Sequence, residues 1–192
     1  MGKIPVIKAI KERWSPYSFS PERVEEEKLE AIFEAARLAP SSMNEQPWLF
    51  VYTTQDDRKY FDTFLGFLFE NNRKWARNAY VLCIVMARTK FSGDNSLNRY
   101  AFYDTGMAVG NLLAQATSLG LYVHQMGGYS VEEVKKYFAA GDLIEPVAMM
   151  AIGYPGDGTE LDEKLRARDL KRRPRKELRE FVFRNELNKP AF

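Results

Sequence analysis

The sequence predicts one domain of the α/β or α+β class, because segments with helical periodicity alternate with short apolar runs typical of strands. The chain has 192 residues, enough for one well-filled core but short of two full domains. Hydrophobic residues make up 45% and charged residues 28%, an ordinary composition for a folded domain. We therefore expect a single domain over residues 1–192, with a core over about 1–155 and a C-terminal arm over about 156–192.

The N-terminal third predicts two helices. Ile7, Ile10 and Trp14 fall three and four residues apart, which indicates a short amphipathic helix. The triplet Ser20-Pro21-Glu22 indicates the N-cap, first-turn proline and early acid of a second helix. That helix ends before Pro40 and carries a clear apolar stripe, formed by Leu29, Ile32, Phe33 and Ala36.

Strands and helices are then expected to alternate. The expected strands cover residues 48–53, 79–87, 122–126 and 146–152. The expected helices lie around residues 61–68, over residues 100–119 and after the capping box at 130–133. Residues 88–98 are polar and predict a surface loop. Gly106 and Gly110 leave room on the long helix for another helix or a flat ligand, or serve only tight core packing.

The C-terminal arm has a different composition. Glycine, proline and charged residues dominate from Gly153 to about Glu177, and apolar residues return at 181–183. Such a segment cannot form a core of its own, so we expect it to lie on its own domain or on a partner chain.

Charge and composition exclude several classes of protein. A net charge of +2 gives little support for nucleic-acid binding, and aromatic residues do not interleave with the basic run 171–176. The single cysteine, Cys83, lies in an apolar run and is expected to be buried and inert. The first residues lack the apolar segment of a secretion signal, and no apolar run approaches the roughly 20 residues of a membrane span. The expected location is the cytoplasm, away from any membrane.

The usual catalytic motifs are absent. The sequence has no Rossmann glycine motif and no phosphate-binding P-loop. One histidine, His124, and one cysteine nearly exclude a His/Cys metal site, and no nucleophile elbow accompanies the histidine. If the chain is an enzyme, a cofactor is therefore expected to carry the chemistry.

Four short segments stand out as candidate ligand-binding segments. Residues 13–19 offer an arginine and serines to a phosphate, and residues 40–48 offer hydroxyl and amide groups to a heterocycle edge. Residues 120–128 end in two glycines, which allow backbone N–H groups to approach a flat ligand. The basic run 171–176 can close over a phosphate. Each segment alone also has an ordinary structural explanation, such as a helix end, a capped loop, a turn or a solvated charge run.

Taken together, these segments resemble the FMN-dependent nitroreductase-like flavoprotein family over nearly the whole chain. The string from Pro40 to Trp48 is the most specific match, and the pattern at Arg13, Ser15 and Phe19 resembles the family's phosphate motif. The remaining matches follow in the family's order: Asn72 to Trp75, Asp104-Thr105-Gly106 with Asn111-Leu112-Leu113, His124 to Gly128, Gly153-Tyr154-Pro155 and Arg172-Arg173-Pro174.

The resemblance implies an α+β fold, a three-layer α/β/α sandwich with a mixed, mainly antiparallel central sheet flanked by helices. It also implies a homodimer with FMN at the subunit interface and a C-terminal arm that wraps the partner. The implied phosphate ligands are Arg13, Ser15, Arg172 and Arg173. Ser41, Ser42 and Asn44 reach the flavin of the second subunit, Asn72 meets its pyrimidine side, and the N–H groups of Gly127 and Gly128 face N5 and O4. Trp14, Tyr17, Pro40, Gln125 and Met126 complete the implied FMN site, which contains no metal.

The implied activity is ping-pong hydride transfer from NAD(P)H through FMN to a small flat acceptor such as a nitroaromatic, a quinone or an activated alkene. Aromatic residues around 64–69 and 100–103 are expected to shape the acceptor pocket. Tyr17 stands where the family commonly has a cation, which would stabilise reduced flavin. Either Lys74 or Arg73 compensates, or the flavin is less easily reduced. The alternative function is therefore a flavin-binding storage or redox-sensing protein with little turnover.

Overall fold

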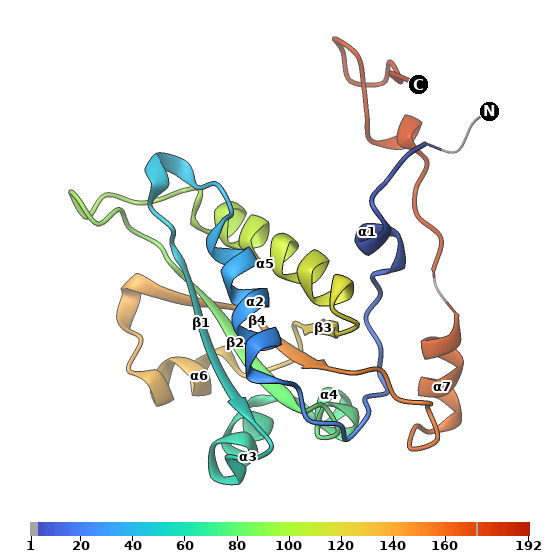
Figure 1. Cartoon of the computed structure of the whole chain (residues 1–192). Helices are drawn as coiled ribbons and strands as arrows, with labels where there is room; N and C mark the ends of the chain where they lie inside the picture. Colours follow the sequence, from blue (N-terminus) through green and yellow to red (C-terminus); the bar gives the residue numbers. More distant parts are fainter. Residues whose placement is uncertain (1–3, 172) are drawn as a thin grey trace.

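The computed structural model describes residues 4–171 and 173–192, and within them a four-stranded sheet lies between two layers of helices (Figure 1). The strands are β1 (Trp48–Thr54), β2 (Val81–Arg88), β3 (Tyr122–Met126) and β4 (Ile144–Gly153). The α-helices are α1 (Lys8–Glu12), α2 (Glu26–Arg37), α3 (Arg58–Phe67), α4 (Glu70–Ala76), α5 (Ala101–Ser118), α6 (Val131–Phe138) and α7 (Glu163–Leu170). The predicted α+β class and three-layer arrangement are confirmed.

The sheet has the order β1-β2-β4-β3, and each of its three described pairings is antiparallel. The prediction of a mixed sheet is therefore wrong for the described strands, which contain no parallel pair. A register shift between Val85 and Met86 lies opposite Pro146, whose missing N–H cannot continue a regular ladder.

The central strand β2 packs against both helical layers, because successive side chains of a strand point to opposite faces of the sheet. Leu82, Ile84 and Met86 pack with α3, α4 and α6 in one core cluster. Val81, Cys83 and Val85 pack with α2 and α5 in the other. A strand that is buried on both faces has no polar alternation, which is why its sequence is a continuous apolar run.

The start of α2 differs from the prediction. Ser20 is not the N-cap: its hydroxyl accepts only the nearby Glu22 N–H, and α2 begins at Glu26 after Glu25. The Ser20 N–H donates to the Tyr154 carbonyl, and Val24 is buried. These contacts keep the chain extended past Pro21. In contrast, the Ser130 side chain accepts the Glu133 N–H and caps α6, as predicted.

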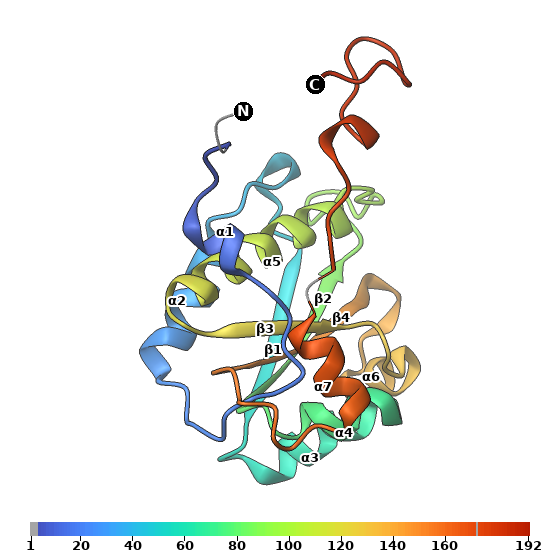
Figure 2. The same ribbon diagram turned by 90° about the vertical axis from the view of Figure 1, so that its right-hand side faces the viewer.

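The last third of the chain has two parts. Residues 156–170 include α7, which was not predicted, and lie against the segment that follows α1 (Figure 2). Residues 173–192 extend away from the body and contain only the short turn Leu178–Glu180 as helix (Figure 1). Among the described helices, none is both long enough and apolar enough to cross a bilayer.

Candidate functional site

The predicted phosphate segment forms a loop after α1. Arg13 is the C-cap of α1, and its guanidinium donates to the Ser15 hydroxyl over 3.4 Å. The Trp14 ring packs edge-on against Tyr122 of β3, with 6.0 Å between ring centroids. The cation and the hydroxyl predicted to bind the phosphate therefore lie side by side on the surface, beside the strand predicted to border the flavin.

The predicted flavin edge is formed by Asn72 and the glycines after β3. The Asn72 side-chain amide donates to the Gly128 carbonyl over 3.1 Å, and the Phe69 N–H donates to the same oxygen over 3.0 Å. A Cβ on Gly128 would lie 2.7 Å from Asn72 Nδ2, whereas a Cβ on Gly127 would have no neighbour within 4 Å. Gly128 thus permits the close approach of Asn72, and Gly127 leaves open space in front of the strand end.

The loop predicted to reach the partner's flavin is a strained turn. Met43, Asn44 and Gln46 have φ values of 53°, 57° and 50°, a region that is costly for non-glycine residues other than asparagine and aspartate. The Ser41 hydroxyl accepts the Gln46 N–H over 2.9 Å, and the buried Asp104 carboxylate accepts the Ser42 N–H over 3.0 Å. The start of α5 therefore holds this loop, whose Pro40 and Asn44 are exposed.

The structure does not bring all predicted FMN residues together within one chain. The loop around Ser42–Asn44 lies at the upper left of Figure 1, whereas α1 and the phosphate segment lie at the right. This separation is compatible with the expectation that Ser41, Ser42 and Asn44 serve the site of a second subunit.

Several predicted residues face the core instead of solvent. The Tyr17 ring packs edge-on against Trp75 and His124, with centroids 5.3 Å and 4.7 Å away. The Met126 side chain is buried between the sheet and α3, so only its backbone can reach a ligand at the strand end. Gln125, the next residue back along β3, is exposed.

The expected acceptor-pocket aromatics divide into two groups. Phe64 and Phe67 are buried against Phe138 and Tyr137, so the expectation that they line a pocket is wrong. They fall on the core face of α3. The others are accessible: Phe69 beside Gly128, and Tyr100, Phe102 and Tyr103 at the start of α5.

The positive charges near the site are distributed unevenly. Arg73 donates to the Leu68 carbonyl and so closes the end of α3, and Lys74 lies 3.9 Å from Glu70 in an exposed pair. Arg173 is exposed at the base of the arm, and Arg172 lies outside the described residues. The two cations proposed to offset Tyr17 are thus already engaged within the chain.

Two titratable groups, the half-buried His124 and the buried Asp169, lie behind the phosphate loop. His124 Nδ1 lies 2.7 Å from the Pro16 carbonyl, and burial lowers the pKa of His124 while this hydrogen bond opposes the shift. The Asp169 carboxylate accepts the Tyr17 N–H over 2.6 Å, and burial raises the pKa of Asp169 against the effect of that bond. Cys83 is buried, as predicted, and burial raises the pKa of its thiol.

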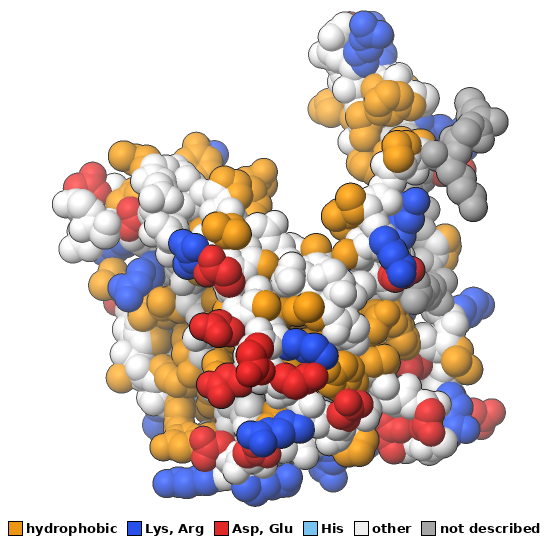
Figure 3. Space-filling view, viewed as in Figure 1, with side chains coloured by type: hydrophobic (Ala, Val, Ile, Leu, Met, Phe, Trp, Pro, Cys, Tyr) orange, Lys and Arg blue, Asp and Glu red, His pale blue; other side chains and the backbone are white. Residues whose placement is uncertain are grey.

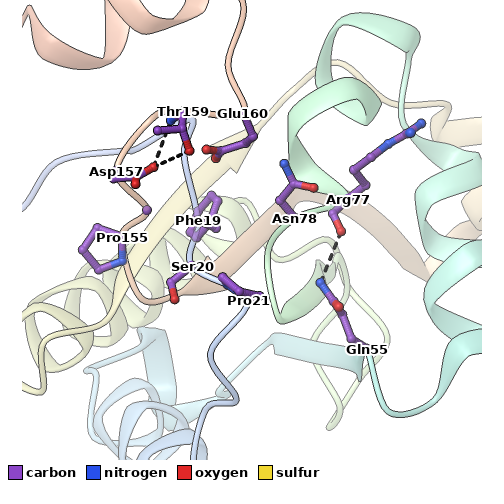
Figure 4. A pocket seen from close by; sticks show the side chains of 11 residues that line it. Phe19, Ser20, Pro21, Gln55, Arg77, Asn78, Pro155, Asp157, Thr159 and Glu160 are labelled. Carbon is purple, nitrogen blue, oxygen red and sulfur yellow. Dashed lines mark hydrogen bonds between the residues drawn. The ribbon is translucent and has the colours of Figure 1, made fainter.

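A cleft of about 610 Å³ lies elsewhere on the body (Figure 4). Phe19 and Pro21 lie between an acidic wall with Asp157 and Glu160 and a second wall with Arg77. Phe19, the last residue of the segment 13–19, lines this cleft, but none of the described residues predicted to contact FMN does.

Sequence reasoning missed three residues that support the site. Asp104 accepts a hydrogen bond from the Ser42 N–H in the strained loop. His124 bonds to the Pro16 carbonyl, and Asp169 accepts the Tyr17 N–H. Asp104 and His124 stood in segments that resembled family motifs, but nothing near Asp169 in the sequence indicates its partner.

The α+β fold brings the glycine end of β3 close to the loop after α1 through the bond of His124 to Pro16, and the comparisons give the class of protein. The sequence profile of the nitroreductase family matches residues 10–74 and 68–154. The chain therefore belongs to the nitroreductase family.

Individual proteins and one solved structure are also similar to this chain. The chain is 34% identical over 130 residues to an uncharacterized 15.4 kDa protein of Mycolicibacterium smegmatis, covering 68% of this chain and 86% of that protein. It is 29% identical to the FMN reductase [NAD(P)H] of Bacillus subtilis, covering 79% of this chain and 66% of that protein. A crystal structure described as an oxidoreductase containing FMN matches with a TM-score of 0.91 and 32% identity, over 98% of this chain and 96% of that one.

Proposed function

We propose that the protein is an NAD(P)H-dependent oxidoreductase that uses FMN and reduces a small flat acceptor. Family membership and the names of the similar proteins, one an FMN reductase and one an oxidoreductase containing FMN, support this proposal. The observation that carries the proposal is that three separately predicted segments lie together in the structure. His124 of β3 bonds to Pro16 of the phosphate loop. Asn72 bonds to Gly128, which follows β3.

The residues present fit FMN chemically. Arg13 and Ser15 offer a cation and a hydroxyl to a phosphate, and the exposed Arg173 follows α7, which packs on the same loop. Gly127 is exposed, and a Cβ added there would have no neighbour within 4 Å, which leaves room for a flat ring. When bound, FMN would supply two-electron transfer from NAD(P)H to the acceptor.

The chain's own contribution is binding, orientation and exclusion of water. Backbone N–H groups at Gly127 and Gly128 would donate to the ring edge, and Asn72 is held in place by its bond to Gly128. The exposed Phe69 beside Gly128 offers an aromatic surface to a flat co-substrate. A nitroaromatic, a quinone or an activated alkene matches this geometry, and no side chain needs to act as a nucleophile.

We also propose a homodimer in which the strained loop of one subunit completes the FMN site of the other. Hydrophobic side chains gather on the arm and on the surface of the body that faces the notch between them (Figure 3). Met43 in the strained loop is 86% exposed and Tyr103 at the start of α5 is 69% exposed, which is unusual for side chains of this size unless a partner covers them.

The first test is an absorbance spectrum of the purified protein, followed by anaerobic titration with NADH and with NADPH. Flavin bands that bleach during titration would establish the reductive half of the reaction, and reoxidation by a quinone or nitroaromatic would establish the other half. Flavin bands that do not bleach would favour storage or redox sensing. Absence of flavin binding after addition of FMN would reject the proposed site.

A further inference from the structure

The peptide bond between Pro16 and Tyr17 is held from both sides, by the half-buried side chain of His124 and the buried side chain of Asp169. Its carbonyl oxygen lies 2.7 Å from Nδ1 of His124. Its N–H donates to Oδ1 of Asp169 over 2.6 Å. Pro16 is buried, and this peptide follows Ser15 directly, so its orientation determines where the loop places the Ser15 and Arg13 side chains.

His124 must act as the donor in its pair, because a carbonyl oxygen can only accept. The neutral ring therefore carries its proton on Nδ1. Its orientation is fixed by aromatic neighbours, with the Trp75 centroid at 4.4 Å and the Tyr17 centroid at 4.7 Å. His124 lies in β3, whose C-terminal end is the glycine pair, so the predicted flavin edge and the phosphate loop are mechanically connected.

Asp169 reaches the loop from the other side. It lies in the last turn of α7, is 9% exposed, and directly precedes the start of the arm. A second carboxylate, Glu160, accepts the Ser18 hydroxyl over 2.6 Å and helps to dock the same stretch. The Asp169 bond therefore fixes the place at which the basic arm leaves the body, beside the phosphate loop.

We propose that His124 and Asp169 are positioning residues that orient the Pro16–Tyr17 peptide and thereby set the FMN phosphate site. A donor on one side and an acceptor on the other satisfy only one orientation of the peptide. If the peptide turned over, its carbonyl would face the carboxylate and its N–H would face the imidazole N–H, and both buried pairs would be lost. This inference rests on the proposed function, because it assumes that FMN occupies the site.

The test compares binding of FMN and of riboflavin, which lacks the phosphate, by quenching of flavin fluorescence. His124→Phe keeps a ring but removes the donor, and Asp169→Ala removes the acceptor. Each is expected to weaken FMN binding about tenfold while riboflavin binding changes less than about twofold. His124→Asn places an amide donor near the Nδ1 position and is expected to restore FMN affinity to within about threefold of wild type.

Asp162→Ala is the matched control for general loosening of α7. Asp162 caps that helix by accepting the Leu165 N–H over 2.8 Å, but it does not bond to the phosphate loop. This variant is expected to leave the ratio of FMN to riboflavin affinity unchanged. If Asp169→Ala or His124→Phe does not fold, Asp169→Asn and His124→Gln replace them, because each keeps a polar side chain of similar size but displaces or weakens one bond. Their affinity ratio is expected to fall about threefold.

Two results would overturn the inference. One is an unchanged FMN affinity in folded variants of both residues, and the other is an equal loss of FMN and riboflavin affinity, which would indicate a purely structural role. Failure of the proposed function looks different, because the wild-type protein itself would then bind neither flavin.

Discussion

At the scale of single residues, Gly128 is a position where one added carbon would disturb the contact with Asn72. An alanine Cβ would lie 2.7 Å from Asn72 Nδ2 and would displace that side chain from the Gly128 carbonyl. Gly128→Ala is expected to destabilise the fold by about 1–3 kcal/mol and to weaken FMN binding. Urea unfolding and flavin fluorescence measure the two effects.

Gly127→Ala is the matched control for this prediction, since its Cβ would meet nothing within 4 Å in the chain itself. Its stability is expected to stay within about 0.5 kcal/mol of wild type. If Gly127 faces a bound ring, its FMN affinity nevertheless falls. Equal stability of the two variants would contradict the tight Asn72 contact.

His124 makes stability depend on pH in a defined direction. Burial lowers its pKa in the folded protein, so the unfolded chain, with a histidine pKa of about 6.5, binds a proton more readily. The free energy of unfolding is therefore expected to fall as the pH drops below about 6.5 and to show no histidine effect above it. Asp169, with a raised pKa, acts in the opposite direction: its contribution is present at low pH and is lost as the pH rises through its folded pKa.

The measurement is urea unfolding at several pH values between about 8 and about 5.5 in the wild type and in His124→Asn. The variant keeps a donor to Pro16 but does not titrate, so its stability is expected to decrease less on acidification. Identical slopes in the two proteins would show that His124 is not the titrating group.

The residues of the site could be predicted from the sequence only where they belong to a local string. Arg13, Ser15 and Gly127 stand in short segments that suggest a ligand only when they are taken together and compared with the family's motifs. Asp169 bonds to Tyr17, which lies 152 residues away in the sequence, and no local sequence pattern predicts such a contact. Tyr17 was expected to take part in the FMN site, and its ring packs edge-on against Trp75, a contact that its place in the motif does not reveal.

At the scale of elements, the contact between α5 and the strained loop is open to test. Asp104→Ala removes the acceptor of the Ser42 N–H and leaves a partly buried donor without a partner. The expected loss is about 1–3 kcal/mol in the free energy of unfolding, and FMN affinity falls because the loop no longer holds its left-handed residues.

Asp104→Asn is the control, because its amide oxygen still accepts the Ser42 N–H. It is expected to lose less than about 1 kcal/mol, part of which reflects removal of a negative charge from the first turn of α5. A loss as large as that of the alanine variant would mean that charge, and not the hydrogen bond, holds the loop.

Long periodic elements could be predicted well, and short polar ones could not. The apolar faces of α2 and α5 and the continuous apolar run of β2 are long patterns, and no local sequence feature in these segments indicates a different structure. The short helices α4 and α7 are rich in charged residues, and they form because tertiary contacts such as that of Asp169 hold them. The false N-cap at Ser20 has the same cause: its bond partner is Tyr154, distant in sequence.

At the scale of the whole molecule, the arm is the part that a single chain does not explain. Phe181 and Leu187 on the arm are 56% and 81% exposed, and Ile7 and Ile10 on the facing segment are 64% and 56% exposed. The apolar residues at 181–183 predicted that the arm lies on something; within the described chain Phe181 is exposed, whereas Val182 and Phe183 are half-buried. Burial of such side chains on a partner would contribute roughly 1.5–3 kcal/mol each.

The last prediction concerns this surface. Leu178 is 40% exposed, and a Leu178→Asp/Phe181→Asp double variant is expected to sediment as a monomer where the wild type sediments as a dimer, since two charges would have to be buried at the interface. Leu143→Asp is the matched control, with 45% exposure in the turn before β4, and is expected to remain dimeric. If the loop with Ser42 completes the partner's site, as proposed, the monomeric variant also loses FMN. A double variant that sediments as a dimer would show that the arm is not the contact between subunits, and retention of FMN by a true monomer would place the whole site within one chain.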